Sequence, residues 1–178
     1  CLIGIKEACE FLDYPVVSGN VSFYNGTNKK NIYPTPVIGG VGVIQNTKNK
    51  INHSLKKEGN LILQVGKTFG HLYQSIFFKE IYSIIEGPPP EINLSNEKSN
   101  GENVLKLINN KLIVSAHDIS SGGLILALAE MSMSSGHGLN IERPSKLSNL
   151  LEYYFGEDQG RYLIEIEPKN LEKIKMIL

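Results

Sequence analysis

The chain has 178 residues, and its 18 lysines and arginines equal its 18 aspartates and glutamates, so the formal net charge is zero. A chain of this length buries a core and holds one domain, or one domain and part of another. The balanced charge gives no electrostatic support for nucleic-acid binding. No apolar run approaches the roughly 20 residues of a membrane span. The first residues also lack a signal peptide, so a cytoplasmic protein is expected.

The chain begins with Cys1 rather than Met, within a helix-like segment, which favours a truncated or processed product. Cys1 and Cys9 are the only cysteines. They lack the Cys-x-x-Cys spacing of a zinc or redox site, and two cysteines make no disulfide framework in a chain of this length. We expect them to serve in packing.

The first quarter of the chain predicts a helix followed by two strands. Residues 3–12 carry the spacing of an amphipathic helix end. Residues 15–17 predict a short buried strand, and residues 36–44 a second one, rich in glycine where backbones or ligands approach. Between them, residues 25–31 form a polar turn cluster with an Asn-Gly signal.

The polar residues 45–58 are typical of a linker and mark the best domain boundary. We therefore divide the chain into residues 1–45, a linker at 46–54, and a second domain at 55–178. Helices and strands mix in the second domain, so the predicted fold class is α+β (mixed α/β). Its expected elements are a central strand at 60–66, a helix at 72–85 ended by the prolines after Gly87, an amphipathic helix at 97–110, a buried strand at 112–116, a helix at 122–134, a strand at 161–167 and a helix from 168.

A first candidate site follows the predicted strand at 15–17, where the apolar run breaks into small polar residues. Gly19 lets a ligand approach the backbone because it has no Cβ. Asn20 offers a carboxamide oxygen of the kind that Mg²⁺ accepts. Ser22 lies two residues further on, so in an extended segment it points to the same face as Asn20. This small polar group is not specific by itself.

The residues Gly66-Lys67-Thr68 after an apolar strand do not favour a phosphate-binding P-loop. The motif needs a glycine five positions before Gly66, and Leu61 stands there. We expect a strand that runs into an exposed Lys-Thr turn instead.

A second candidate site is the segment at 115–123, which places His117 and Asp118 and then a Ser-Ser-Gly-Gly turn between a buried strand and a helix N-terminus. The free N–H groups of such a helix end attract anions. Asp118 could ligate Mg²⁺ while the glycines admit a phosphate. Alternatively, Asp118 and Ser120 simply cap the helix. The local residues leave both interpretations open.

The acidic loop at 155–161 is a third candidate, with two interpretations that composition cannot separate. It could ligate a metal or hold a substrate carboxamide, or it could be a solvated turn. His53, His71 and His137 lack partners at ligand spacing, so we expect surface or turn positions for them.

Four ordered motifs together carry a resemblance that covers nearly the whole chain. They are P-V-V-S-G-N-V-S-F-Y-N, P-T-P-V-I-G-G-V-G, A-H-D-I-S-S-G-G-L-x-x-A-L-A-E-M and F-G-E-D-Q-G-R-Y. In this order they resemble the phosphoribosylformylglycinamidine synthase family, within the aminoimidazole ribonucleotide synthase-like superfamily. The match is to the later of the two homologous halves of the synthetase subunit (subunit II).

The resemblance implies an ATP-dependent C–N ligase of purine biosynthesis that converts formylglycinamide ribonucleotide to the amidine. Its ammonia comes from a glutaminase subunit, and the amide oxygen is activated by phosphoryl transfer. Carried over by motif, Gly19 contacts ATP, Asn20 binds Mg²⁺ and Ser22 touches the substrate. ATP and Mg²⁺ are the implied cofactors, and no catalytic residue is assigned in this chain.

The resemblance ranks Asp118, Glu157 and Gln159 second, because in this half the matching segments line a pseudo-symmetric site that holds a structural nucleotide or nothing. Asp158 and Gly160 also stand where serines are common in the family, which weakens direct substrate contact. Residues 1–45 then end an N-terminal-type domain and residues 55–178 form most of a C-terminal-type domain. The remaining part of the same synthetase is the expected partner, and the 178 residues alone are expected to be inactive.

Two alternatives stay open. One is a related superfamily kinase or synthetase that acts on another substrate with the same ATP architecture. The other is a non-catalytic nucleotide-binding scaffold that docks the glutaminase.

Overall fold

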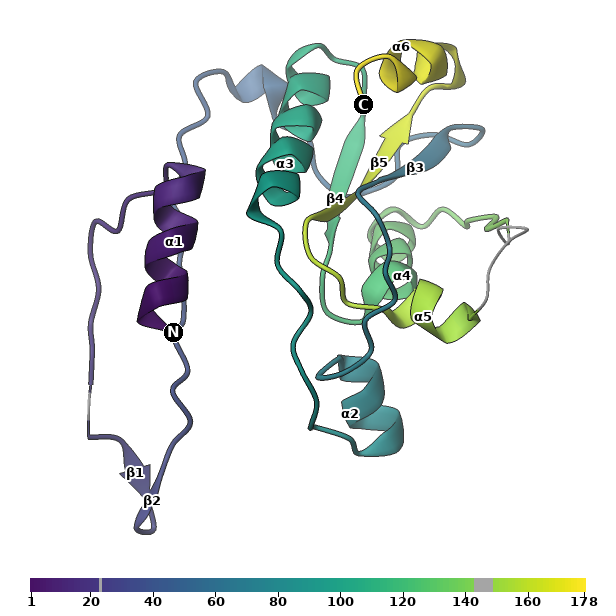
Figure 1. Ribbon diagram of the computed structural model, residues 1–178. Helices are drawn as coiled ribbons and strands as arrows, with labels where there is room; N and C mark the ends of the chain where they lie inside the picture. Colours follow the sequence, from purple (N-terminus) through teal and green to yellow (C-terminus); the bar gives the residue numbers. More distant parts are fainter. Residues whose placement is uncertain (23, 143–148) are drawn as a thin grey trace. The chain divides into compact units, whose positions relative to one another are not determined.

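The computed structural model describes residues 1–22, 24–142 and 149–178 (Figure 1). The chain divides into two compact units, Cys1–Gln45 and Asn46–Leu178. The first unit holds helix α1 (Leu2–Leu12) and a hairpin of β1 (Gly26–Thr27) and β2 (Lys30–Asn31). The helix at 3–12 and the turn at 25–31 are therefore confirmed.

The hairpin turn has left-handed backbone at both of its central residues. Asn28 has φ 52° and Lys29 has φ 64°. Positive φ at both positions is the signature of a type I′ turn, whose twist suits a two-residue hairpin loop. Asparagine tolerates this conformation better than most residues, which explains why it opens the turn.

The strands predicted at 15–17 and 36–44 are absent, and their apolar side chains are exposed. Val17 and Val37 are each 91% exposed, and none of the described residues in 1–45 is buried. A strand needs a neighbour to satisfy its backbone groups, and among the described residues of this unit only β1 and β2 pair. Both predictions were wrong because the sequence pattern carries no information on whether a partner strand exists.

The second unit is built on an antiparallel sheet of three strands in the order β3-β5-β4. The strands are β3 (Leu61–Val65), β4 (Ser115–Ile119) and β5 (Arg161–Ile166). Leu163 of β5 lies opposite Gln64 on one side and His117 on the other. The strands predicted at 60–66 and 161–167 are confirmed, but the central place belongs to β5, whose residues are almost all buried.

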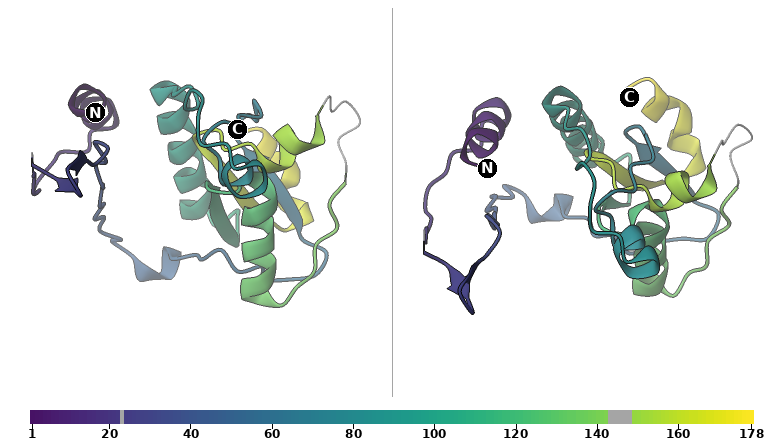
Figure 2. Two further views of the ribbon diagram at one scale, coloured as in Figure 1. Left: turned by 90° about the horizontal axis from the view of Figure 1, so that it is seen from below. Right: turned by 60° about the horizontal axis from the view of Figure 1, so that its bottom comes forward.

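Helices cover both faces of this sheet (Figure 2). Successive residues of a strand point to opposite faces. Ile164 and Ile166 therefore pack with α3 (Leu94–Asn109) and α6 (Leu171–Lys175). Leu163 packs with α4 (Gly123–Ser135) on the other face, where α5 (Leu150–Phe155) lies against α4.

Side-chain caps mark where two of the helices begin. Asn93 accepts a hydrogen bond from the backbone N–H of Asn96 at the start of α3, and Ser75 accepts one from Phe78 at the start of α2 (Ile76–Tyr82). Helix α2 ends at Ser83, which has φ 57°. The helix predicted at 72–85 is thus shorter, and the prolines after Gly87 do not end it.

The remaining segments adjust the predicted boundaries. The strand predicted at 112–116 begins later, so β4 contains both His117 and Asp118. The short 3₁₀ helices η1 (Thr47–Asn49) and η2 (Pro168–Asn170) precede β3 and α6. The predicted helix at 122–134 is confirmed as α4, and α5 was not predicted. The overall class is mixed helix and sheet, as predicted.

The polar stretch before β3 lies within the second unit and packs on its core. Leu55 is buried, and the backbone N–H groups of Lys56 and Lys57 donate to the buried carboxylate of Glu165.

None of the described helices has the length and apolar character that a membrane span requires.

Leu107→Ala is expected to lower the free energy of unfolding by about 2–5 kcal/mol, because Leu107 is fully buried and its truncation leaves a cavity. Leu105→Ala on the same helix is the matched control, since Leu105 is 56% exposed. Urea unfolding of both variants measures the difference. Equal losses would contradict the assignment of Leu107 to the core.

Candidate functional site

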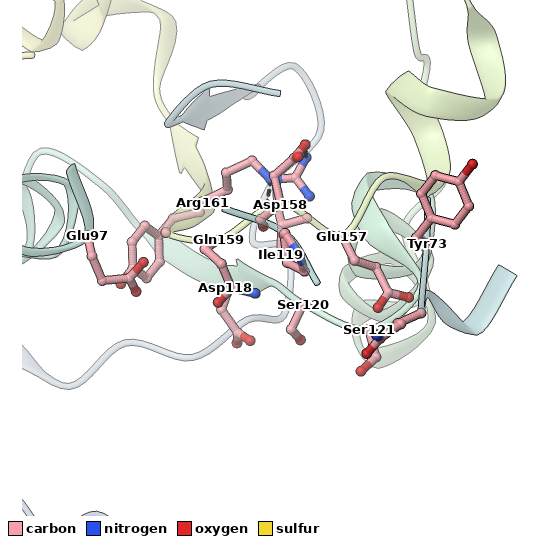
Figure 3. Close-up of a pocket in the computed structure, with 14 residues that line it drawn as sticks. Tyr73, Glu97, Asp118, Ile119, Ser120, Ser121, Glu157, Asp158, Gln159 and Arg161 are labelled. Carbon is pink, nitrogen blue, oxygen red and sulfur yellow. Dashed lines mark hydrogen bonds and ion pairs between the residues drawn. The ribbon is translucent and has the colours of Figure 1, made fainter. Parts of the chain in front are cut away.

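One end of the sheet in the second unit opens into a pocket of about 380 Å³ (Figure 3). Segments far apart in sequence meet there: the turn before α2, helix α3, the end of β4 and the loop before β5. Most of its side chains are polar, and four of them are acidic. The residues that line it are Tyr73, Gln74, Pro90, Glu97, Asp118, Ile119, Ser120, Ser121, Glu157, Asp158, Gln159, Gly160, Arg161 and Tyr162.

Asp158 anchors the wall of this pocket. Its side chain is 5% exposed, and its Oδ2 accepts hydrogen bonds from the N–H groups of Phe69 and Gly70, both at 2.9 Å. Its Oδ1 accepts a third from His71 at 3.2 Å. Backbone donors that converge on one carboxylate fix both chain segments. Asp158 therefore has a structural role.

Arg161 is the cation of the same cluster and is 1% exposed. Its Nη1 lies 3.8 Å from Asp158 Oδ2 and donates to Thr68 Oγ1 at 3.1 Å. Its Nη2 donates to the carbonyl of Gly156 at 2.6 Å, and its Nε to the carbonyl of Asp158. Burial lowers the pKa of Arg161, and the carboxylates of Asp158 and Glu157 oppose that shift. The loop at 155–161 is thus not a solvated turn.

Glu157 occupies the starts of two helices. Its Oε1 accepts from the N–H of Gly122 at 2.7 Å, at the start of α4, and from Ile76 at 2.8 Å, at the start of α2. Neither Asp118 nor Ser120 caps α4, because the N-cap residue of this helix is Gly122. The capping interpretation was wrong because the acceptor comes from a distant loop.

The glycine pair at the start of α4 serves close packing. Gly122 has φ 83°, and a Cβ there would lie 2.3 Å from Leu126. Gly123 has φ 70°, and a Cβ there would lie 2.8 Å from the carbonyl of Gly156. Only glycine accommodates both the left-handed backbone and these contacts. Other residues of the protein therefore fill the space beside these glycines. The interpretation that the glycines admit a phosphate was wrong.

His117 and Asp118 lie in β4, with Asp118 at the pocket. The ring of His117 contacts Asp118 Oδ1 through Nδ1 at 3.2 Å and Glu130 Oε2 through Nε2 at 2.9 Å. It also lies against His53, with ring centroids 5.0 Å apart. Burial alone would raise the pKa of Asp118, but hydrogen bonds from Ser120 and the backbone, together with His117, outweigh it and lower the pKa. Asp118 is ionised at neutral pH.

Glu97 and Tyr162 form the other end of the pocket and were not singled out from the sequence. Burial raises the pKa of Glu97. Burial, and then the charges of Glu97 and Asp118, raise the pKa of Tyr162.

The described residues contain no group of three or more His, Cys, Asp or Glu side chains that could hold a metal ion.

Gly19, Asn20 and Ser22 lie in the first unit, on an exposed segment without regular structure. A Cβ on Gly19 would meet nothing within 4 Å, so a ligand has room there. The carbonyl of Ser22 accepts a hydrogen bond from Asn25 Nδ2 at 3.1 Å. The roles of Gly19, Asn20 and Ser22 stay predictions.

Residues 57–178 match the family of AIR synthase related proteins, C-terminal domain. Because this match covers well over half of the chain, the chain belongs to that family.

Two curated relatives are similar along almost the whole chain. Phosphoribosylformylglycinamidine synthase subunit PurL of Pelagibacter ubique is 53% identical over 178 residues, which is 100% of this chain and 24% of the relative. The subunit of the same name from Bartonella bacilliformis is 48% identical over 175 residues, 97% of this chain and 23% of the relative. The chain thus spans about a quarter of the length of these relatives.

Solved structures share the fold at lower identity. Phosphoribosylformylglycinamidine synthase II from Thermotoga maritima aligns with a TM-score of 0.56 at 19% identity, over 74% of this chain and 21% of that one. PurL from T. maritima complexed with FGAR aligns with a TM-score of 0.59 at 17% identity, over 74% and 23%.

Asp158→Ala is expected to lower the free energy of unfolding by about 3–5 kcal/mol, because it leaves the buried Arg161 charge without its partner carboxylate and three backbone N–H groups without their acceptor. Gln159→Ala, at the exposed neighbour, is expected to change it by less than about 0.5 kcal/mol. Chemical denaturation compares the two. A loss for Asp158→Ala no larger than the control's would refute the structural role.

Glu97→Gln is expected to make stability less dependent on pH. The folded pKa of Glu97 lies above its ordinary value of 4.5, so ionisation favours the unfolded chain. The contribution of Glu97 to stability is present below pH 4.5 and is lost as pH rises through the raised folded pKa.

The measurement is urea unfolding of the wild type and the variant between about pH 4 and pH 7. We expect the free energy of unfolding of the variant to increase relative to that of the wild type as pH rises. Glu102→Gln on the exposed face of α3 controls for the loss of a surface charge. No gain for Glu97→Gln beyond this control would contradict the assignment.

Proposed function

We propose that this chain is part of the ATP-dependent ligase that converts formylglycinamide ribonucleotide to formylglycinamidine ribonucleotide in purine biosynthesis. The observation that carries the proposal is the 53% identity along the full chain to a subunit of phosphoribosylformylglycinamidine synthase. The four ordered motifs and the family match at residues 57–178 support it.

Residues 1–45 belong, in this proposal, to the end of an N-terminal-type domain, residues 46–54 link the domains, and residues 55–178 form the C-terminal-type domain. The absence of buried residues among those described in 1–45 supports the first part, because a segment this rich in exposed valine and isoleucine needs apolar surface to pack against. The rest of the same synthetase supplies that surface.

The nucleotide and metal contacts lie in the first unit. The open space beside Gly19 suits the approach of ATP, and the exposed carboxamide of Asn20 is a suitable oxygen ligand for Mg²⁺. Ser22, two residues further on, contacts the substrate. When bound, Mg²⁺ neutralises phosphate charge and aligns the phosphoryl transfer that activates the amide oxygen.

The pocket of the second unit has a supporting role in this scheme. Glu157 is bonded to two backbone N–H groups, so its carboxylate is committed to the fold. Asp118 and Gln159 are more exposed and face the pocket, as Figure 3 shows. We assign the reaction to the first unit, which holds Gly19, Asn20 and Ser22, and treat the second unit as its scaffold.

Ammonia for the reaction comes from a glutaminase subunit. A structure of PurLQS from Thermotoga maritima is among the fold neighbours. We place the enzyme in the cytoplasm, with no nucleic-acid or membrane partner. The balanced charge of the chain supports the first of these exclusions.

Asn20→Ala in the full-length protein is expected to lower kcat/KM at least about tenfold and to raise the Mg²⁺ concentration needed for half-maximal turnover, because an oxygen ligand of the metal is lost. Steady-state assays across a Mg²⁺ titration measure both. Asn31→Ala, an exposed asparagine of the hairpin, is the matched control. Unchanged turnover with normal Mg²⁺ dependence would favour a nucleotide-binding scaffold.

A further inference from the structure

The sequence contains two Asn-Gly pairs, Asn25-Gly26 and Asn100-Gly101, in opposite structural settings. An asparagine followed by glycine is chemically labile. The glycine has no Cβ to shield its backbone nitrogen, and that nitrogen can reach the asparagine side chain when the backbone is free to turn. The two pairs therefore differ in how far the fold restrains them.

Asn25-Gly26 lies in the exposed hairpin of the first unit. Strands β1 and β2 have two residues each, and every residue from 24 to 33 is exposed. A hairpin of this length is marginally stable in water, so it opens readily. The side chain of Asn25 donates a hydrogen bond from Nδ2 to the carbonyl of Ser22 at 3.1 Å. An exposed bond of this kind restrains the side chain weakly.

Asn100-Gly101 lies inside the helix α3, which runs over Leu94–Asn109. In a helix, the N–H of Gly101 bonds to a carbonyl one turn earlier and points away from the preceding side chain. Asn100 Nδ2 also donates to the carbonyl of Gly160 at 2.9 Å. The same helix carries the fully buried Leu107, so its opening requires disruption of the core.

We propose that Asn25-Gly26 is a deamidation site, and that its conversion breaks the hydrogen bond from Asn25 to the Ser22 carbonyl. Asn100-Gly101 is protected from the same reaction. The backbone nitrogen of Gly26 attacks Cγ of Asn25, a C–N bond forms, and the bond from Cγ to Nδ2 breaks. Ammonia leaves with the amide proton of Gly26. Water then opens the succinimide ring at either carbonyl and gives aspartate or isoaspartate.

The reaction removes the donor that binds Ser22. The new carboxylate has no N–H at neutral pH and repels the Ser22 carbonyl oxygen. The segment from Asn20 to Ser22 then loses its hydrogen bond to the hairpin. This consequence for activity rests on the proposed function, because there Ser22 contacts the substrate. The chemical step itself does not depend on that assignment.

The test is incubation of the full-length protein at about pH 8–9, where base promotes attack by the glycine backbone nitrogen. Peptide mapping then measures isoaspartate and aspartate at both pairs. We expect conversion at residue 25 to exceed that at residue 100 by about tenfold or more in the native protein. In denaturant the two rates are expected to converge, since the dipeptides are identical. Equal native rates, or an unmodified residue 25, would overturn the proposal.

Gly26→Ala is the matched variant, because its Cβ crowds the attacking nitrogen and meets the Lys30 carbonyl at a tight 3.1 Å. It is expected to slow conversion at residue 25 and to leave residue 100 unaffected. An unchanged rate at residue 25 would count against attack by this nitrogen.

The turnover assay separates the consequence from the chemistry. In the wild type, KM for formylglycinamide ribonucleotide is expected to rise with the fraction converted, while KM for ATP stays constant; Gly26→Ala is expected to show no such drift. If residue 25 converts while KM stays constant, the role of Ser22 is wrong and the modification site stands.

Discussion

The buried pair of Asp158 and Arg161 is the interaction on which the second unit depends. Asp158 binds three consecutive backbone N–H groups before α2, while Arg161 begins the central strand β5 and reaches Thr68 and two carbonyls of its own loop. Neither charge is tolerable in a buried place without the other and without these hydrogen bonds. The pair thus joins the turn before α2 to the centre of the sheet.

The neighbouring residue Glu157 extends this arrangement to α4. Its carboxylate lies where the free N–H groups of α2 and α4 converge, which is where an anionic ligand would otherwise bind. The protein itself therefore supplies the anion, and Gly122 and Gly123 let the helix end approach the loop closely enough. The segment at 115–123, whose pattern suggests phosphate binding, is here hydrogen-bonded to the loop that carries Glu157.

The sequence predicted most of the second unit because its elements carry their own signals. The run Arg-Tyr-Leu-Ile-Glu-Ile-Glu at 161–167 identified β5, and apolar spacing identified α3 and α4. It failed where the outcome depends on distant partners. The strands expected at 15–17 and 36–44 have no pairing neighbour within residues 1–22, 24–142 and 149–178, and the donors to Asp158 come from residues 69–71, far away in the sequence. Glu97 went unnoticed because a single glutamate on an amphipathic helix has no local signal for a pocket.

In the function proposed above, the first unit binds ATP and Mg²⁺, while the second is held together by its own acidic loop. A crystal structure of the full-length protein with Mg²⁺ and a non-hydrolysable ATP analogue tests it most directly. We expect Mg²⁺ at about 2.1 Å from the carboxamide oxygen of Asn20, with Glu157 still bonded to the N–H groups of Ile76 and Gly122. A metal away from Asn20, with a phosphate in place of Glu157 at the start of α4, would contradict it.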